Sequence, residues 1–192
     1  MTTPYGNHQL SIYAGGLKGR RPDLPLRYVD LEARARQMLS DEAYWYVAGG
    51  AGESSMTANR DAFDRYRLVP RMLTDISVRD LGRTVLGKRQ PTPLMIAPLG
   101  VQEIIHERAE LAVAEAAAAV DVPMILSTVS SFALEEVRSA LGATSGWYQL
   151  YWPNDDALAT SLVQRAEAAG YEAIVITLDT KMLAWRERDL EG

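Results

Sequence analysis

Residues 147–179, WYQLYWPNDDALATSLVQRAEAAGYEAIVITLD, decide the fold class of this chain. Two apolar runs, 147–151 and 173–179, flank a segment that Asn154 is expected to cap and Gly170 to end. Apolar residues recur through that segment at helical spacing: Leu158, Leu162, Ala166 and Ala169. Runs that are apolar throughout, rather than at alternate positions, are typical of parallel strands buried on both faces. The stretch therefore predicts a parallel strand–helix–strand unit.

The same pattern extends upstream as far as residue 91. Two further apolar runs, 94–98 and 123–127, precede helical segments at about 110–120 and 134–141. Continuous apolar strands that alternate with helices predict an α/β fold, as a parallel sheet or a barrel. No G-x-G-x-x-G follows the first run, so a dinucleotide-binding unit is poorly supported.

The first 90 residues are less regular. Asp30 is expected to cap one helix, and Ser40 or Asp41 a second, shorter one that stops at the glycines of 49–52. Residues 57–90 mix charge with short apolar pieces, and we interpret them as a connector with one helix near its start. This part of the sequence predicts helices in front of the β/α units.

Length and composition limit the architecture and the function. The 192 residues fit one domain or two small ones. Residues 1–27, rich in Gly, Pro and Arg and without a period, are interpreted as an N-terminal arm, and the domain as 28–192. A net charge of −5 argues against nucleic-acid binding. Without Cys, and with only His8 and His106, no metal site is expected. No transmembrane run or secretory signal is visible, so we expect a cytoplasmic protein without membrane contact.

Polar or conformationally special residues end all four apolar runs. They are Pro98, Leu99 and Gly100; Ser127 and Thr128; Tyr151, at the end of the run that also carries Gln149; Thr177 and Asp179. The carboxyl ends of strands build the site in β/α folds, and neutral donors and acceptors suit a heteroaromatic ring with carbonyl and imino groups. Tyr46 and Tyr151 are candidates to bind a carboxylate or hydroxyl. Alternatively, a lone Ser or Thr there is a helix cap, Tyr151 is core, and Asp179 caps the next helix. Four successive polar ends favour a site.

Several stretches resemble the FMN-dependent 2-hydroxy-acid oxidase family. They are Tyr46-Val-Ala-Gly-Gly-Ala51, Asn59-Arg-Asp-Ala-Phe63, Met95-Ile-Ala-Pro-Leu-Gly100, Leu126-Ser-Thr128, Gln149-Leu-Tyr151, Thr177-Leu-Asp-Thr180 and Arg186-Glu-Arg-Asp189. Within the family, the segment 149–156 is especially similar to lactate 2-monooxygenases. Gly100 stands where oxidases of the family typically have Ala and lactate 2-monooxygenases have Gly. Val129 stands where glycolate oxidase has an aromatic residue near the substrate.

The resemblance implies a (β/α)8 TIM barrel with FMN at the carboxyl ends of its strands, of which this chain covers the N-terminal helices and about four β/α units. It places the cofactor against Pro98, Leu99, Gly100, Ser127, Gln149 and Thr177. It assigns the substrate to Tyr46, Tyr151 and Arg186, and pairs Asp179 with a catalytic histidine. That histidine and the phosphate site lie in later parts of the family's sequences and have no counterpart here.

The implied function is FMN-dependent oxidation of a small (S)-2-hydroxy acid, with lactate and oxygen as the expected substrates. The alternatives are a glycolate or lactate oxidase, or an inactive half-barrel that survives as a remnant or an interaction module. A complete barrel needs about 250 residues. We therefore expect the chain alone to be inactive, and to act with a complementary C-terminal half or, once completed, as a homo-oligomer.

Overall fold

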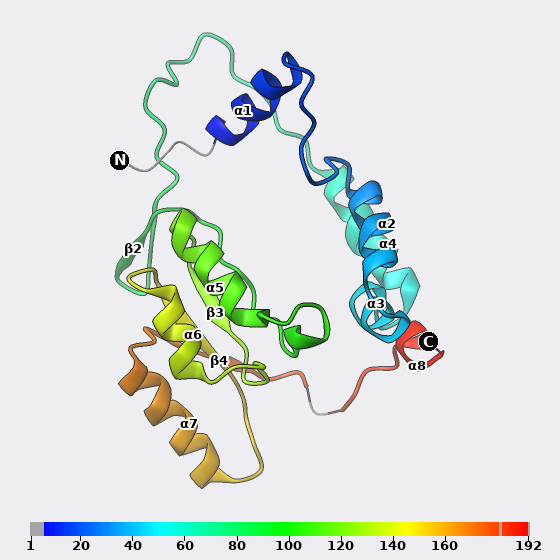
Figure 1. The fold of residues 1–192 in the computed structure, drawn as a ribbon. Helices are drawn as coiled ribbons and strands as arrows, with labels where there is room; N and C mark the ends of the chain where they lie inside the picture. The colour runs from blue at the N-terminus through cyan, green and yellow to red at the C-terminus, as the bar shows by residue number, and fades with distance from the viewer. Residues whose placement is uncertain (1–5, 181, 192) are drawn as a thin grey trace. The chain divides into compact units, whose positions relative to one another are not determined.

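The chain divides into two compact units in a computed structural model that describes residues 6–180 and 182–191 (Figure 1). The helical unit comprises Met1–Ala58 and Trp185–Gly192, and the sheet unit comprises Asn59–Ala184. Among the described residues, no helix combines the length and apolar character needed to cross a membrane.

A parallel sheet forms the centre of the sheet unit. Its strands are β3 (Met124–Leu126), β4 (Gly146–Tyr151) and β5 (Ile174–Thr177), in the spatial order β3-β4-β5. Both pairings are parallel, and the second aligns Tyr151 with Thr177. The predicted parallel arrangement is confirmed for these three runs, and their carboxyl ends lie at one edge of the sheet.

The first apolar run departs from its prediction as a strand. It is reduced to one parallel bridge between Ile96 and Met124. The Ile96 N–H donates to the Pro123 carbonyl at 2.8 Å, and the Ile125 N–H donates to the Ile96 carbonyl at 3.0 Å. Pro93 and Pro98 flank the run and have no N–H to donate, so the ladder cannot extend past them. The run still lies beside β3 and continues the order of the sheet.

Three helices pack on the sheet: α5 (Ala109–Val120), α6 (Leu134–Leu141) and α7 (Asp156–Ala169) (Figure 1). The helices and the strands share one hydrophobic core. The most deeply buried side chains of this core include Leu126, Val137, Leu141, Tyr148 and Leu150. The Tyr171 hydroxyl donates to the Leu134 carbonyl at 2.8 Å, and burial raises the pKa of that hydroxyl. The predicted helices are thus confirmed, with Gly142 and Gly170 following α6 and α7.

The cap of α7 is a correction. Asp155, not Asn154, is the N-cap, because its Oδ1 accepts from the Ala157 N–H at 2.8 Å and from the Leu158 N–H at 3.4 Å. Gly170 ends the helix at φ 89°, a left-handed conformation that Gly adopts without strain.

A hairpin within the predicted connector joins the amino ends of the strands. It consists of β1 (Arg83–Val85) and β2 (Lys88–Gln90), paired antiparallel. Gln90 Nε2 donates to Ser145 Oγ at 3.2 Å, and Ser145 Oγ donates to Glu172 Oε2 at 2.6 Å. Lys88 forms an ion pair with Glu172. Desolvation acts to raise the pKa of Glu172, but its hydrogen bonds with Lys88 and Ser145 outweigh it and lower that pKa.

The helical unit contains α1 (Gly6–Gly16), α2 (Tyr28–Met38), α3 (Asp41–Ala48) and α8 (Glu187–Glu191). The helix α4 (Glu53–Asp61) and the 3-10 helix Ala62–Arg65 lead into the sheet unit, where a second 3-10 helix spans Gln102–Ile104.

Local interactions explain where these helices begin and end. Ser40 caps α3 as predicted, since its Oγ accepts from the Ala43 N–H at 3.2 Å. Asp30 does not cap α2, because it lies within the first turn and pairs with Arg27 at 2.6 Å. The helix α1 lies inside the predicted irregular arm, and the described side chains of α1 are mostly exposed. Without a buried stripe, its sequence carried no helical period to detect.

Candidate functional site

Gln149 joins the carboxyl ends of three neighbouring strands. Its side chain is buried in β4, where Nε2 donates to Thr177 Oγ1 at 2.9 Å and Oε1 accepts from the Thr128 N–H at 3.1 Å. These bonds direct the amide oxygen toward the end of β3 and the amide nitrogen toward β5. The structure therefore brings Gln149 and Thr177 together, as expected for the ends of parallel strands.

Thr128 holds this arrangement in place, although its sequence position suggested only a strand end. Its Oγ1 donates to the Gln149 carbonyl at 2.5 Å and accepts from the Tyr151 N–H at 2.9 Å. The hydroxyl thereby continues the ladder between β3 and β4 after β3 has ended at Leu126. Because any Thr after a strand has the same sequence signature, only the register reveals this role.

Ser127 and Gly100 lie close together beyond the strand ends. Ser127 is buried, and its Oγ accepts from the Val129 N–H at 3.2 Å. This local hydrogen bond is one sufficient reason for a Ser at position 127, with no ligand involved. A hydroxyl that accepts one hydrogen bond can still donate its own proton, however. A Cβ on Gly100 would lie 3.3 Å from Ser127 Oγ and 2.3 Å from Val129 Cγ2. Glycine at this position lets the loop after the first run approach the loop after β3.

The strand ends thus present neutral hydrogen-bonding groups with capacity to spare. Thr177 Oγ1 accepts from Gln149, which leaves the Thr177 proton able to donate elsewhere. Gln149 Nε2 carries a second N–H, and its Oε1 a second lone pair. Such a set can recognise carbonyl and imino groups along one edge of a planar ring, while it supplies no charge.

Tyr46 and Arg186 meet within the helical unit. The Arg186 guanidinium lies 4.8 Å from the Tyr46 ring centroid, and Nη2 donates to the carbonyls of Tyr46 and Gly49. Its Nε lies 3.8 Å from Asp189 Oδ2. Arg186 therefore satisfies carbonyls at the end of α3, and its contact with a substrate stays a prediction, as does that of Tyr46.

Tyr151 and Asp179 follow β4 and β5 in the sheet unit. Tyr151 is half-buried at the last position of β4. Asp179 is exposed and accepts from Thr180 Oγ1 at 3.4 Å. The next helix, α8, begins only at Glu187, so Asp179 is not its cap. The roles predicted for Tyr151 and Asp179 remain predictions.

Comparison with known proteins yields a consistent set of relatives. A family model described as FMN-dependent dehydrogenase matches residues 35–192. An L-lactate oxidase of Lysinibacillus sphaericus is 43% identical over 88% of this chain and 44% of its own length. Glycolate oxidase 1 of Zea mays is 41% identical over 85% of this chain and 44% of its own length.

Solved structures are similar as well. A crystal structure of mandelate oxidase superposes with a TM-score of 0.79 at 41% identity, over 85% of this chain and 49% of that one. The chain thus spans about half the length of the relatives it matches.

Proposed function

The chain belongs to the FMN-dependent dehydrogenase family, and on that premise we propose that it forms the N-terminal part of an FMN-dependent 2-hydroxy-acid oxidase. In this proposal residues 28–192 are half of a barrel preceded by an arm at 1–27. The observation that carries it is the set of polar groups at the carboxyl ends of adjacent strands: the Gln149 amide bonds Thr177 Oγ1 and the Thr128 N–H, and the buried Ser127 directly precedes Thr128.

The residues at the strand ends fit an isoalloxazine ring. Its polar edge consists of neutral carbonyl and imino groups, which match the spare donors and acceptors of Gln149 and the hydroxyls of Ser127 and Thr177. Backbone from Pro98 through Gly100 is proposed to lie along the ring, and the missing Cβ of Gly100 lets the loop that carries Ser127 approach this backbone closely. When bound, FMN supplies the acceptor for the two electrons removed from the hydroxyl carbon.

The substrate we propose is a small (S)-2-hydroxy acid, with lactate and oxygen as the first choice. Tyr46, Tyr151 and Arg186 are assigned to the substrate carboxylate and hydroxyl, which suit phenol and guanidinium donors. Asp179 is assigned to a histidine of the remaining half, where a carboxylate would stabilise the charged imidazole. The L-lactate oxidase relative supports lactate, and the glycolate oxidase relative keeps glycolate as the second candidate.

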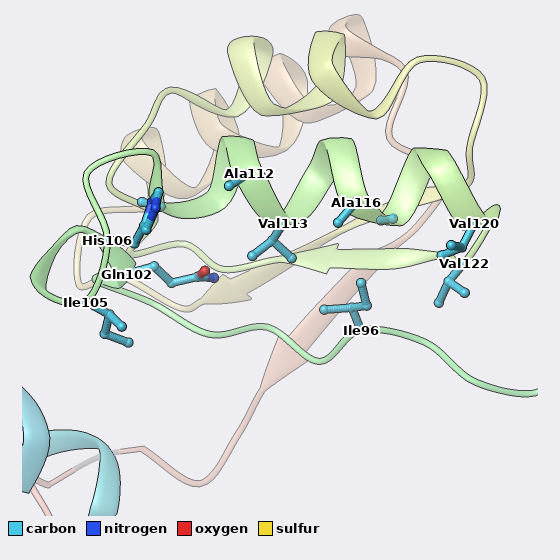
Figure 2. A pocket seen from close by; sticks show the side chains of 11 residues that line it. Ile96, Gln102, Ile105, His106, Ala112, Val113, Ala116, Val120 and Val122 are labelled. Carbon is cyan, nitrogen blue, oxygen red and sulfur yellow. The ribbon is translucent and has the colours of Figure 1, made fainter. Parts of the chain in front are cut away.

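A groove on the sheet unit supports completion by further β/α units. It has a volume of about 610 Å³ and lies between α5 and the run 94–98, where Val113 and Ala116 face the same space as Ile96 (Figure 2). Among the described residues, no further strand pairs with this run on the side away from β3. An apolar helix face beside an unpaired sheet edge is what a neighbouring β/α unit would cover. We therefore propose that the complementary C-terminal half of the barrel docks here.

Docking can be tested by mixing the chain with the C-terminal half of the L-lactate oxidase relative. We expect a one-to-one complex on size-exclusion chromatography, lost in Val113→Lys but retained in Glu115→Lys, a change on the same helix outside the groove. Retention of the complex with Val113→Lys would remove this groove as the docking face.

The activity is tested on that complex by titration with FMN and assay with (S)-lactate and glycolate. A lactate 2-monooxygenase yields acetate, carbon dioxide and water, whereas an oxidase yields pyruvate and hydrogen peroxide. We expect lactate to be the better substrate and acetate the main product. The chain alone is expected to bind FMN weakly, since each neutral hydrogen bond contributes only about 0.5–1.5 kcal/mol. A complex that neither binds FMN nor oxidises either acid supports the inactive-module alternative instead.

A further inference from the structure

Glu110 is a buried carboxylate for which the proposed function has no use so far. It lies in the first turn of α5, and the residue is 0% exposed. Its Oε2 accepts from the Ser131 N–H at 3.1 Å, and its Oε1 accepts from the Gln102 N–H at 3.4 Å. Burying a carboxylate is costly, and hydrogen bonds to backbone N–H groups offset part of the cost. Packing alone therefore does not explain why a carboxylate, rather than an apolar side chain, is buried at residue 110.

The two amides belong to two different loops at the carboxyl ends of the strands. The first loop, residues 99–108, follows the run 94–98 and contains Gly100 and Gln102. The second loop, residues 127–133, follows β3 and contains Ser127 and Ser131. Glu110 thus bridges the two segments that are proposed to contact the cofactor.

Other hydrogen bonds align the same two loops. The Val101 N–H donates to the Val129 carbonyl at 2.9 Å, and the Glu103 N–H donates to Ser131 Oγ at 3.1 Å. The loops therefore run side by side, and Glu110 adds a bond to each of them from the helix beneath.

The first loop contains a strained backbone conformation. The hydrogen bonds between Glu110 and both loops, here called the Glu110 clamp, help to maintain it. Val101 has φ 53°, a left-handed conformation that is unusual for a β-branched residue. Strained conformations persist only where the surrounding contacts enforce them, and they concentrate at functional sites. Glu110 accepts a hydrogen bond from the N–H of Gln102, the residue that follows Val101, and so helps to fix the backbone conformation directly after Gly100.

We propose that Glu110 is a positioning residue that fixes these two loops, so that Gly100 and Ser127 face the cofactor together. The proposal rests on the proposed function only for the identity of the ligand. A carboxylate suits the task because both of its oxygens accept, whereas a glutamine of the same shape would turn an NH₂ donor toward one of the two amides.

Hydrogen exchange of the full chain tests the clamp without any cofactor. In Glu110→Gln we expect amide exchange in 101–103 and 129–131 to accelerate on the order of 10- to 100-fold, while β4 and β5 keep their protection. Glu136→Gln is the matched control, because its carboxylate also accepts a backbone N–H, from Ala133 at 3.1 Å, but locally and at an exposed position. Should Glu110→Gln fail to fold, Glu110→Asp keeps an acceptor-only carboxylate on a shorter stem, and we expect a smaller acceleration in the same loops.

The reconstituted complex with a C-terminal half supplies a second readout. We expect Glu110→Gln to raise the Kd for FMN about 10-fold or more and to alter the absorption band of the bound flavin, and Glu136→Gln to change neither. Unchanged loop exchange, or exchange that rises equally in β4 and β5, overturns the positioning role. A wild-type complex that binds no FMN refutes the proposed function, whereas the exchange experiment still decides whether Glu110 holds the loops.

Discussion

Replacing Gly100 with Ala should destabilise the sheet unit, and Val129 determines by how much. The new Cβ would lie 2.3 Å from Val129 Cγ2 and 3.2 Å from the Val129 carbonyl oxygen. Ordinary carbon contacts are about 3.5–4.0 Å, so Cγ2 must move by more than 1 Å. Val129 is 48% exposed and can move outward, but its branched side chain has few alternative rotamers. We therefore expect a cost of about 1–2 kcal/mol, in the lower part of the range for overpacking.

A double-mutant cycle separates this collision from other effects of the substitution. Val129→Ala removes Cγ2, so Gly100→Ala in that background should cost about 0.5 kcal/mol or less. The free energy of unfolding of the four proteins, from urea denaturation of the full chain, gives the coupling between the two sites. If Gly100→Ala costs the same with and without Val129→Ala, Val129 does not restrict position 100, and the steric reasoning is refuted.

The contact between Gly100 and Val129 also determines how the reaction products should be compared. Oxidases of the family typically have Ala at the position of Gly100, and lactate 2-monooxygenases have Gly, so we expect the smaller residue to leave room for the keto-acid product. In this chain, however, Val129 Cγ2 already occupies part of the space that a Cβ at position 100 would fill. Acetate and hydrogen peroxide should therefore be measured for Gly100→Ala both alone and combined with Val129→Ala in the reconstituted complex. Equal yields across this set would remove the space at Gly100 as the cause of a monooxygenase outcome.

Three further predictions concern a helix cap, an ion pair and a tyrosine. Asp155→Ala should destabilise the chain by about 1 kcal/mol in thermal or urea unfolding, and Asn154→Ala by much less. Lys88→Gln should lower the urea midpoint at neutral pH. The pKa of Glu172 is lower in the folded than in the unfolded chain. The ionised Glu172 side chain therefore stabilises the fold above its unfolded pKa of about 4.3, and this stabilisation is lost as the pH falls through the folded value. The difference in stability between wild type and variant should accordingly shrink in acid. Tyr151→Phe in the reconstituted complex should lower kcat/KM for lactate about 10- to 150-fold, whereas an unchanged value would make Tyr151 a packing residue.

The regular part of the fold was predictable from residue patterns alone. The runs that became β3, β4 and β5 are short, mostly apolar and separated by helices, which is the pattern of a parallel sheet. The burial expected of such strands holds for β3 and β4, whereas β5 is only partly buried and Ile176 is exposed. The run at 94–98 has the same composition but ends at Pro98, and the number of ladder bonds it could form depended on its neighbour. At the start of α7, Asn154 and Asp155 are both good caps, and the turn geometry that selects between them is not written in residue type.

The candidate site was predictable at the level of strand ends but not of its connections. Gln149 and Thr177 were expected to meet, because parallel strands place their carboxyl ends at one edge. Thr128 was predicted only as a strand end and Glu110 only as part of a helix, because their hydrogen-bond partners depend on strand register and on the path of two loops. Arg186 bonding the carbonyls of α3 equally depends on tertiary structure, which spacing along the chain does not reveal.

The hairpin at the amino ends of the strands has a consequence for the order of folding. Its bonds join residues 55 positions apart, Gln90 with Ser145, and 84 positions apart, Lys88 with Glu172. Closing such loops costs entropy that a single ion pair or amide bond cannot repay, and an isolated two-stranded hairpin is marginal in water. During synthesis β1 and β2 leave the ribosome before either partner exists. We therefore expect the hairpin to dock onto the amino ends of β4 and β5 only after these strands have formed, as a late step in folding.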